Sequence, residues 1–265
     1  MSRDAHFSAC EETVWRRDPD RYFSALFAPA PKRPFLFALY AFHHEIARIA
    51  ETVREPMLAQ VRLAWWRETV VGARAGKPRN HDVAKALADT LAANDLPEDI
   101  FERMIAARSF DAAQERFADM GALERYADAT SGSVMRLAAR VLGEASDDLA
   151  REAGIAYALA GLLRAIPFHA ARCKLYLPAD LMREAQLAAD EVFVGGGGEK
   201  LQKIKDEIAR VARTHLAAAR KLAKPREALP AFLPAALVPL YLKRGNPPLW
   251  RRQLVFMRTA ISGRI

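Results

Sequence analysis

The sequence has little cysteine, little glycine and no long uninterrupted apolar run. Only two cysteines, Cys10 and Cys173, occur in 265 residues, which excludes a disulfide framework, and neither stands at the spacing of a zinc module. With 13 glycines and 15 prolines, collagen-like and low-complexity classes are excluded too. Hydrophobic residues make up 51% and charged residues 27%, so the chain has the balance of a globular protein with a sizeable core.

The sequence also shows no pattern typical of a targeting signal or a membrane-spanning segment. The first twelve residues, MSRDAHFSACEE, contain no apolar core for a secretory signal and are too acidic for a mitochondrial transit peptide. No run of 18 apolar residues occurs, because Ala153–Ile166 is too short and Ala228–Leu242 is interrupted by three prolines. We therefore expect a cytoplasmic, bacterial protein.

Acidic residues are outnumbered. Lys and Arg total 40 against 32 Asp and Glu, which gives a formal net charge of +8 and an isoelectric point near 9.7. This excess favours anionic partners such as diphosphates, anionic lipid headgroups or nucleic acid. Because no stacking motif, zinc knuckle or helix-turn-helix pattern accompanies the charge, we expect no nucleic-acid partner.

Helical periodicity dominates the long segments. Apolar residues recur three and four positions apart across Glu199–Leu222. The Pro-rich stretch Pro29–Pro34 precedes a helix that we expect over Phe35–Thr52, and Ser146 has the chemistry of an N-cap for the helix that follows it. Alternating segments bounded by hairpin turns are not seen, so the predicted fold class is all-α.

Two tracts rich in glycine or proline separate these helices. Gly195–Gly198 with Lys200 resembles a phosphate-binding loop only faintly, because no strand precedes it and no Ser or Thr follows the lysine, and we expect a flexible connection. Residues 225–250 carry five prolines from Pro230 to Pro248 and could either dock on a membrane surface or close the end of a bundle. We favour closure of the bundle for Pro230–Leu242 and leave the last 20 residues open.

Five segments together resemble a known family. Two are long, FALYAFHHEIARIAE at residues 37–51 and GLLRAIPFHAARCKLYLP at residues 161–178, and three are shorter, at residues 22–29, 62–69 and 130–134. In this order they resemble the signature regions of the squalene/phytoene synthase family, most strongly over residues 18–182. The resemblance implies a single domain over residues 1–265 that folds as an isoprenoid-synthase-type helical bundle around a central cavity.

The resemblance also shows where this sequence departs from an active synthase. In active members, two facing helices each carry aspartates four residues apart, so that their carboxylates point to one spot and hold Mg²⁺ ions on the substrate diphosphate. The aligned positions here are Ala47 and Glu51 on one helix and Ala165 and His169 on the other, with Arg48 where a further aspartate is usual. One carboxylate cannot assemble such a site. We therefore expect no catalytic residue, no metal and no cofactor, with Mg²⁺ needed only by a synthase.

The replacements themselves resemble one branch of the family. LRAIPFHAAR at residues 163–172 and AFHHEIA at residues 41–47 are similar to the branch that includes the mitochondrial assembly factor for respiratory complex I. That branch lacks the synthase aspartates. The resemblance therefore implies a non-catalytic role, with complex I subunits or other assembly factors as partners.

Several polar residues are candidates for a surviving ligand site: Arg164, Arg172, His169, Glu51, Tyr40 and His44. The two arginines either retain an anion site, for a lipid-like or prenyl diphosphate ligand, or pair with carboxylates of neighbouring helices. His44, Glu51 and His169 could form a transition-metal site, but we favour histidines that are hydrogen-bonded in a polar cavity lining.

An aromatic set at helical spacing leaves two interpretations open. Its members are Phe35, Phe37, Tyr40, Phe42, Trp65 and Trp66. They either line a lipid cavity or form part of the core, and we favour the core.

Three functions remain compatible with these features. We favour the non-catalytic assembly factor, whose former active-site cavity serves as a pocket or docking surface. A head-to-head prenyl diphosphate synthase of isoprenoid biosynthesis would need substitute acids, and the best pair, Glu45 with Glu51, does not share the required helix face. A peripheral adaptor on the inner face of the cytoplasmic membrane would share the assembly role without a pocket ligand.

Overall fold

The computed structural model describes residues 3–53, 55–113, 115–222 and 225–265, and over this part of the chain every regular element is a helix. The longer helices are α1 (Arg3–Arg17), α3 (Arg33–Thr52), α4 (Pro56–Arg74), α5 (Asp82–Ala93), α6 (Glu98–Ala113), α9 (Asp147–Ala170), α12 (Gly198–Lys221) and α15 (Leu249–Ser262). The shorter ones are α2 (Pro19–Ala25), α7 (Met120–Ala127), α8 (Ser133–Val141), α10 (Ala179–Glu184), α11 (Ala189–Phe193), α13 (Leu229–Phe232) and α14 (Val238–Arg244), with short turns η1 (Ala30–Lys32), η2 (Asp128–Gly132) and η3 (Leu233–Leu237). The all-α expectation is confirmed.

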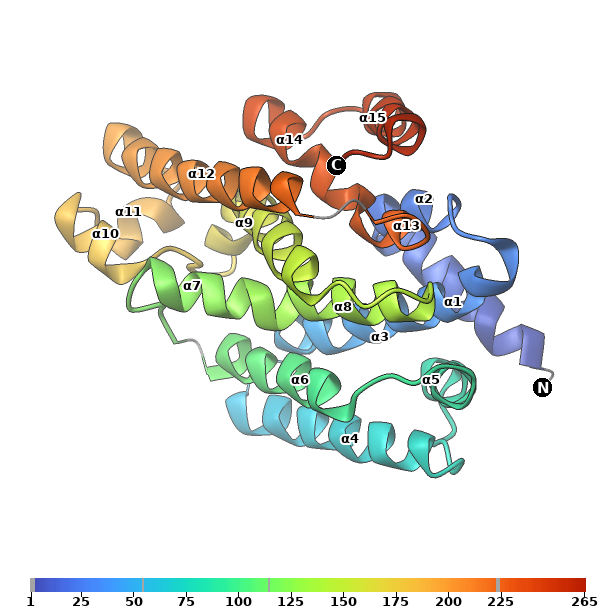
Figure 1. Ribbon diagram of the computed structural model, residues 1–265. Coiled ribbons are helices and arrows are strands. Elements are labelled where there is room, and N and C mark those ends of the chain that lie inside the picture. The colour runs from blue at the N-terminus through green and yellow to red at the C-terminus, as the bar shows by residue number, and fades with distance from the viewer. Residues whose placement is uncertain (1–2, 54, 114, 223–224) are drawn as a thin grey trace.

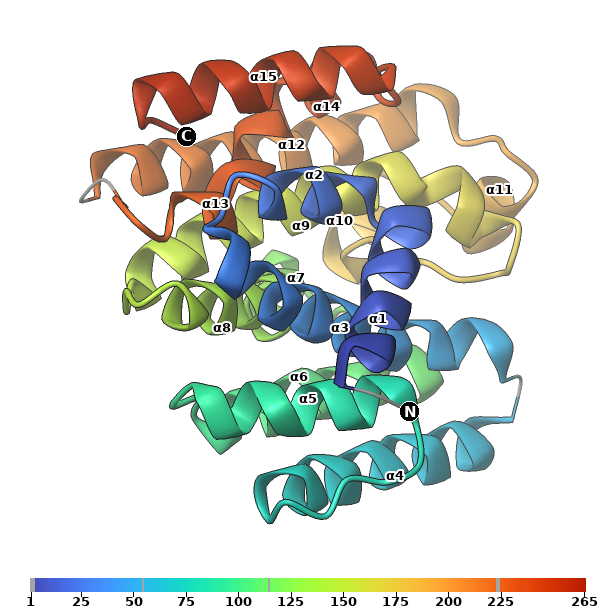
Figure 2. The ribbon, with the colours of Figure 1, turned by 90° about the vertical axis from the view of Figure 1, so that its right-hand side faces the viewer.

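The helices stack in successive layers across the molecule. From one edge to the other, α4 is followed by α5 and α6, then by α3 with α7 and α8, then by α9, α12 and finally α14 with α15 (Figure 1). Turning the molecule by 90° shows α15 running along the outer edge, beyond α2 and α12 (Figure 2). Helices α3 and α9, which carry the two family segments, therefore lie inside the bundle.

Helix α3 forms where the sequence predicts it and starts two residues earlier. Pro34 lies in its first turn, where a missing backbone N–H costs nothing, and the chain becomes extended at Val53. Residues 36–42 of this helix are buried without interruption, because α1, α5, α6 and α8 pack around it, and Ile46 and Ile49 are buried further along. The helix thus offers only its last turns to solvent.

A close backbone contact fixes how α9 crosses its neighbour. Helices α7 and α8 are joined without a break by the π turn η2, which contains Gly132. A Cβ atom built on Gly154 of α9 would lie 2.4 Å from the Cα atom of Gly132. Only glycine at position 154 allows the two backbones to approach so closely.

Helix α9 is the one helix, among those described, whose length and hydropathy would suffice to cross a membrane. In the structure it packs against α8, η2, α12 and α14 inside the bundle (Figure 1), as the core helix of a globular protein does. Ser146 is its N-cap, as expected, although the serine hydroxyl makes no capping bond to the backbone.

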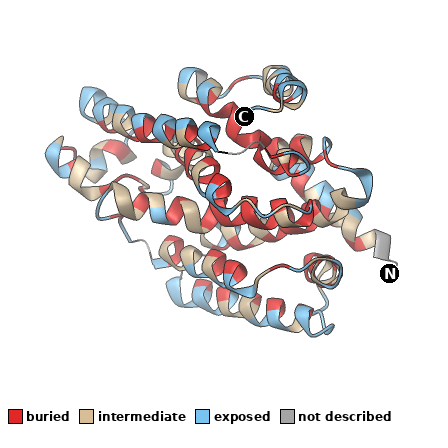
Figure 3. Ribbon diagram, viewed as in Figure 1, coloured by how far each residue is buried: buried red, intermediate tan, exposed pale blue. Residues whose placement is uncertain are grey.

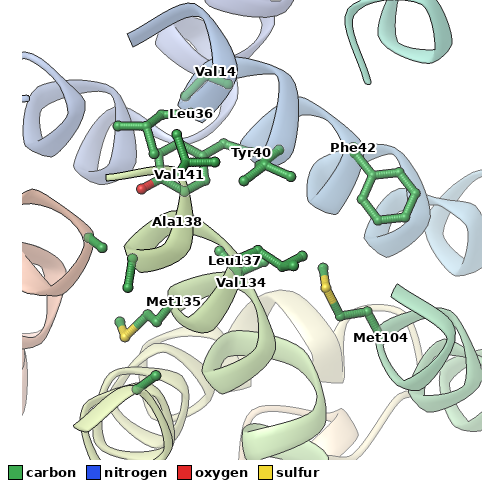
Figure 4. Packing of buried hydrophobic residues seen from close by; sticks show 14 of the residues in the cluster. Val14, Leu36, Tyr40, Phe42, Met104, Val134, Met135, Leu137, Ala138 and Val141 are labelled. Atoms are coloured by element: carbon green, nitrogen blue, oxygen red, sulfur yellow. The ribbon is translucent and has the colours of Figure 1, made fainter. Parts of the chain in front are cut away.

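The buried hydrophobic residues form two clusters. The larger draws on α1–α6, α8, α9 and the α13–α15 region with the end of α12, and the smaller draws on α7 and α9–α12. In Figure 3 the buried residues, in red, lie mainly in the inner helices. In the larger one, Leu36 and Tyr40 of α3 face Leu137, Ala138 and Val141 of α8 (Figure 4). The aromatic set of α3 and α4 lies in or against this cluster, so its interpretation as core is confirmed. A single domain over residues 1–265 stays a prediction.

The proline-rich segment closes one end of the bundle, as we favoured. Of residues 228–238, all except Leu229 are buried, and they pack against α2, α8 and α9 as the short helices α13, η3 and α14. Pro230, Pro234 and Pro239 each fall in the first turn of one of these pieces, where proline is tolerated.

Candidate functional site

The four positions aligned with the synthase aspartates lie near the C-terminal ends of α3 and α9. Glu51 is exposed on the last turn of α3, and Ala47, one turn earlier, is half-buried. Ala165 and His169 are half-buried on the last two turns of α9, on either side of Pro167. Glu51 is thus the one carboxylate at these positions, and it faces solvent.

A cavity of about 510 Å³ opens beside Glu51. Its lining comes from three places, the end of α3, the end of α6 and the segment after α9: Ala50, Glu51, Val53, Asp111, Ala112, Ala171, Arg172, Cys173 and Lys174. The structure therefore brings two of the sequence-predicted candidates, Glu51 and Arg172, to one cavity. It adds Asp111 and Lys174, which the sequence analysis did not single out.

Lys174 holds the cavity together. Its ammonium donates to the backbone carbonyl of Ala50 at 2.8 Å and to that of Asp111 at 3.2 Å, so one side chain joins α3, α6 and the segment after α9. Burial lowers the pKa of Lys174, while the negative charges of Asp111 and Glu51 act in the opposite direction. An ammonium group therefore lies close to the position where an active synthase would need cations.

Asp111 is buried and fully used by its neighbours. Its carboxylate accepts hydrogen bonds from Arg108 at 3.0 Å, from Tyr126 at 2.9 Å and from Tyr176 at 2.8 Å. Burial raises the pKa of both tyrosines, so the phenols stay protonated and act as donors. The three donors satisfy the buried charge of Asp111.

His169 packs on the same cluster. Its ring centre lies 4.4 Å from that of Tyr176. Burial lowers the pKa of His169 to about 4, with Lys174 and Arg172 contributing in the same direction and Asp111 opposing them. The imidazole is therefore neutral at physiological pH.

A second buried polar network lies between α2, α9, α14 and α15. Asp20, 5% exposed, accepts hydrogen bonds from the hydroxyl groups of Tyr157, at 2.9 Å, and Tyr241, and pairs with Arg252 at 2.7 Å. Neither Asp20 nor its partners stand out as site residues in the sequence. The charged run Asp18-Pro-Asp20-Arg21, directly before the family segment at residues 22–29, could have indicated this network. Charged side chains on a helix that is buried by its neighbours need hydrogen-bonding or ionic partners.

Arg21 connects this network to α3, because it lies beside both Tyr157 and Tyr40. Its guanidinium pairs with Asp18 at 2.6 Å and lies 5.4 Å from the ring centre of Tyr157 and 5.8 Å from that of Tyr40. Tyr40 is buried in the core, where burial raises its pKa. This candidate therefore contacts the interior network rather than the cavity beside Glu51.

The remaining candidates separate in space. Arg164 lies 3.8 Å above the ring centre of Tyr241 and donates to the side-chain oxygen of Asn246 at 2.8 Å. Arg172, which is exposed, lies 3.7 Å from the ring centre of Phe168 and donates to its backbone carbonyl. Among the described residues, neither arginine pairs with a carboxylate.

His44 is half-buried on α3, and burial lowers its pKa. Among the described residues no group of three His, Cys, Asp or Glu side chains is placed to hold a metal ion, and this includes His44, Glu51 and His169. The interior acids Asp20 and Asp111 each accept from an arginine and two tyrosines. This donor set does not fit a cluster of Mg²⁺ ions, which requires several free hard oxygen ligands.

Comparison with known proteins agrees with the architecture. A family model described as squalene/phytoene synthase matches residues 14–245. A solved dehydrosqualene synthase in complex with ligand superimposes with a TM-score of 0.82 at 18% identity, over 98% of this chain and 96% of that one. A squalene synthase from Alicyclobacillus acidocaldarius superimposes with a TM-score of 0.73 at 20% identity, over 98% and 94% of the two chains. The fold is thus the helical fold of these synthases.

Curated relatives have two kinds of name. The human protein named NADH dehydrogenase (ubiquinone) complex I, assembly factor 6 is 28% identical over 240 residues, which are 89% of this chain and 72% of the relative. The presqualene diphosphate synthase of Rhodopseudomonas palustris is 28% identical over 208 residues, which are 76% of this chain and 73% of the relative. The percentage identity is the same for both relatives, so it does not distinguish their two functions for this chain. The residues of the site are needed to distinguish them.

Proposed function

This chain belongs to the squalene/phytoene synthase family, and we propose that it is a member without prenyl-transfer chemistry that acts in the assembly of respiratory complex I, the NADH:ubiquinone oxidoreductase. The proposal depends on which residues occupy the two helix faces that hold Mg²⁺ in an active synthase. Ala47, Ala165 and His169 supply no carboxylate there, and Glu51 is exposed.

The charges around Glu51 support the same proposal. Arg172 and Lys174 line the cavity that Glu51 lines, so two positive charges share it with that carboxylate. Mg²⁺ ions would have to bind beside an ammonium and a guanidinium, with the exposed Glu51 and an Asp111 already hydrogen-bonded to Arg108, Tyr126 and Tyr176 as the lining carboxylates, which Coulomb's law disfavours. The protein works without Mg²⁺ or another cofactor, and the cavity serves to bind rather than to ionise a ligand.

The partners follow from the relatives. Proteins named as complex I assembly factor 6 from human and from Dictyostelium discoideum match 89% and 92% of this chain. Complex I subunits or other assembly factors are therefore the proposed partners, and nucleic acid is not one. A lipid-like or anionic ligand is the proposed occupant of the cavity, because Arg172 and Lys174 offer it positive charge.

Deletion of the gene tests this function directly. We expect membranes of the deletion strain to lose NADH:quinone reductase activity and assembled complex I, and both to return when the gene is restored. Succinate:quinone reductase activity is the internal control and should not change. Intact complex I in the deletion strain would overturn the proposal.

A variant of Glu51 separates the two functions within one strain. The Glu51→Gln protein should restore complex I as well as the original protein, because an exposed carboxylate that holds no metal can be replaced by an amide of the same shape. If the protein is a synthase, the same variant loses its last metal-binding acid, and it fails to restore the prenyl product in the deletion strain.

A head-to-head prenyl diphosphate synthase is the second candidate. The observation in its favour is the presqualene diphosphate synthase relative, at the same 28% identity as the human assembly factor. Purified protein incubated with farnesyl diphosphate and Mg²⁺ decides it. Release of inorganic diphosphate with formation of a C30 product that stops on addition of a chelator would establish the synthase and remove the non-catalytic proposal.

A further inference from the structure

Helix α15 presents an apolar stripe to solvent. Trp250, Leu254, Met257 and Ile261 are 59%, 39%, 50% and 88% exposed. They are spaced by four, three and four residues, which places all four on one face of the helix. Isolated exposed apolar residues are common on globular proteins, but four in line on one helix form a continuous strip.

The opposite face of α15 is fixed to the body of the protein. Phe256 is 1% exposed and Thr259 is 6% exposed, and the guanidinium of Arg252 pairs with the buried carboxylate of Asp20 at 2.7 Å. In Figure 2 the helix runs along the outer edge of the molecule, with no element beyond it. The stripe is therefore held outward in one orientation.

Charge on this segment has a single sign. Residues 246–265 contain four arginines, Arg251, Arg252, Arg258 and Arg264, and no Asp or Glu. Arg252 is neutralised by Asp20, whereas Arg258 and Arg264 are exposed. The guanidinium of Arg251 lies 4.9 Å from the ring centre of Trp250, at the N-terminal end of the stripe. Positive charge thus flanks the apolar strip along its length.

We propose that α15 is a membrane-interface helix that docks this protein on a bilayer containing anionic phospholipid. The stripe enters the boundary between headgroups and acyl chains, where the amphipathic ring of Trp250 is favoured. Arg251, Arg258 and Arg264 stay at the level of the headgroup phosphates. A protein partner is a weaker match, because the face offers no acid and few hydrogen-bonding groups besides arginine.

The docking role of α15 does not depend on the assembly function. It assigns a surface to the chain whether or not complex I is the protein that it serves. The measurement uses purified protein and lipid alone, so failure of lipid binding and failure of complex I assembly are separate results.

Vesicle sedimentation tests the proposal. The purified full chain should sediment with vesicles of phosphatidylcholine and phosphatidylglycerol and bind vesicles of phosphatidylcholine alone at least tenfold more weakly. The double variant Leu254→Ser, Ile261→Ser should bind the anionic vesicles at least tenfold more weakly than the original protein. The matched control is Met57→Ser, Val194→Ser, whose side chains are 80% and 84% exposed on other elements, and its binding should not change.

The electrostatic part has its own pair of variants. Arg258→Gln should weaken binding to anionic vesicles and reduce its dependence on salt, whereas Arg213→Gln on α12, also an exposed arginine, should leave both unchanged. The proposal is overturned if the folded protein stays in the supernatant with anionic vesicles, or if the α15 and control variants bind equally. Loss of complex I assembly in the α15 variant without any lipid binding would assign the stripe to a protein partner instead.

Discussion

The Lys174 ammonium donates to the backbone carbonyl of Ala50 at 2.8 Å and thereby joins the segment that follows α9 to the last turn of α3. Ala50 directly precedes Glu51, the one carboxylate at the four positions that the resemblance aligns with the synthase aspartates. The contact places an ammonium group beside Glu51. It also makes Lys174 a structural link, because the same ammonium reaches the carbonyl of Asp111.

Removing that link should destabilise the protein. We expect Lys174→Ala to lower the free energy of unfolding by about 1–2 kcal/mol, because two carbonyls lose a charged hydrogen-bond donor. Lys200→Ala is the matched control, since Lys200 donates to the Gln186 carbonyl at 2.8 Å on the exposed surface, and it should cost less than about 0.5 kcal/mol. Urea titrations of the two variants decide the matter, and equal losses would mean that Lys174 holds nothing together.

Glycine 154 should tolerate no side chain. A Cβ atom there would lie 2.4 Å from the Cα atom of Gly132, and both atoms belong to packed backbones. We expect Gly154→Ala to lower the free energy of unfolding by about 3 kcal/mol or more. On the same helix, Gly161 has no atom within 4 Å of its Cβ position, so Gly161→Ala should be neutral or add up to about 1 kcal/mol. Thermal unfolding of the two variants checks this packing. A Gly161→Ala protein less stable than the Gly154→Ala protein would refute it.

The buried pair of Asp20 and Arg252 should hold α15 in place. In Asp20→Asn the guanidinium loses its counter-charge and the two tyrosines lose a charged acceptor, so we expect a loss of about 2–4 kcal/mol. Tryptic cleavage within α15 should begin earlier. Asp147→Asn breaks an exposed pair with Arg140 and should cost less than about 1 kcal/mol. Unchanged proteolysis of Asp20→Asn would show that other contacts of α15 suffice.

His169 should make stability depend on pH on the acid side of neutrality. Its pKa is about 4 in the folded protein against an ordinary value of 6.5, so the unfolded chain takes up a proton first as pH falls. The stabilisation is complete above pH 6.5, declines between pH 6.5 and 4 and is lost below that, by up to about 3 kcal/mol in total. His169→Gln should flatten this slope. An imidazole NMR titration of His169 centred near pH 6.5 would contradict the burial argument.

Arg172 and Arg164 should respond differently to an anion. Inorganic diphosphate should raise the melting temperature of the protein by about 2–4 °C at tenfold excess over its dissociation constant. Arg172→Ala should remove most of this rise, because Arg172 lines the cavity with Lys174, whereas the guanidinium of Arg164 is already engaged by Tyr241 and Asn246. Loss of the shift in Arg164→Ala alone would place the anion at the interior network.

Much of the architecture was predictable because it depends on local pattern. Helix α3 was expected over Phe35–Thr52 from its flanking prolines and periodicity, and it spans Arg33–Thr52. The closure of one end by Pro230–Leu242 was expected because proline breaks helices while the apolar residues between need burial. Both arguments need only neighbouring residues.

The contacts of the candidate site were not predictable in the same way. Arg164 and Arg172 stand eight residues apart in one segment, yet they face Tyr241 and Phe168 respectively. The network around Asp20 joins residues more than 130 and 230 positions away along the chain. No periodicity reports on such distant pairs, since the packing of several helices decides which polar groups meet.

By itself, the sequence determined the helical class and the family, because each depends on residue identity and spacing along the chain. Only the tertiary structure decided that Glu51, Arg172 and Lys174 line one cavity and that Asp20 and Asp111 are taken up by arginines and tyrosines. Only it decided which face of α15 is exposed. The physical reason is that buried charges must find partners and apolar faces must find cover across the whole fold, and sequence neighbours do not supply them.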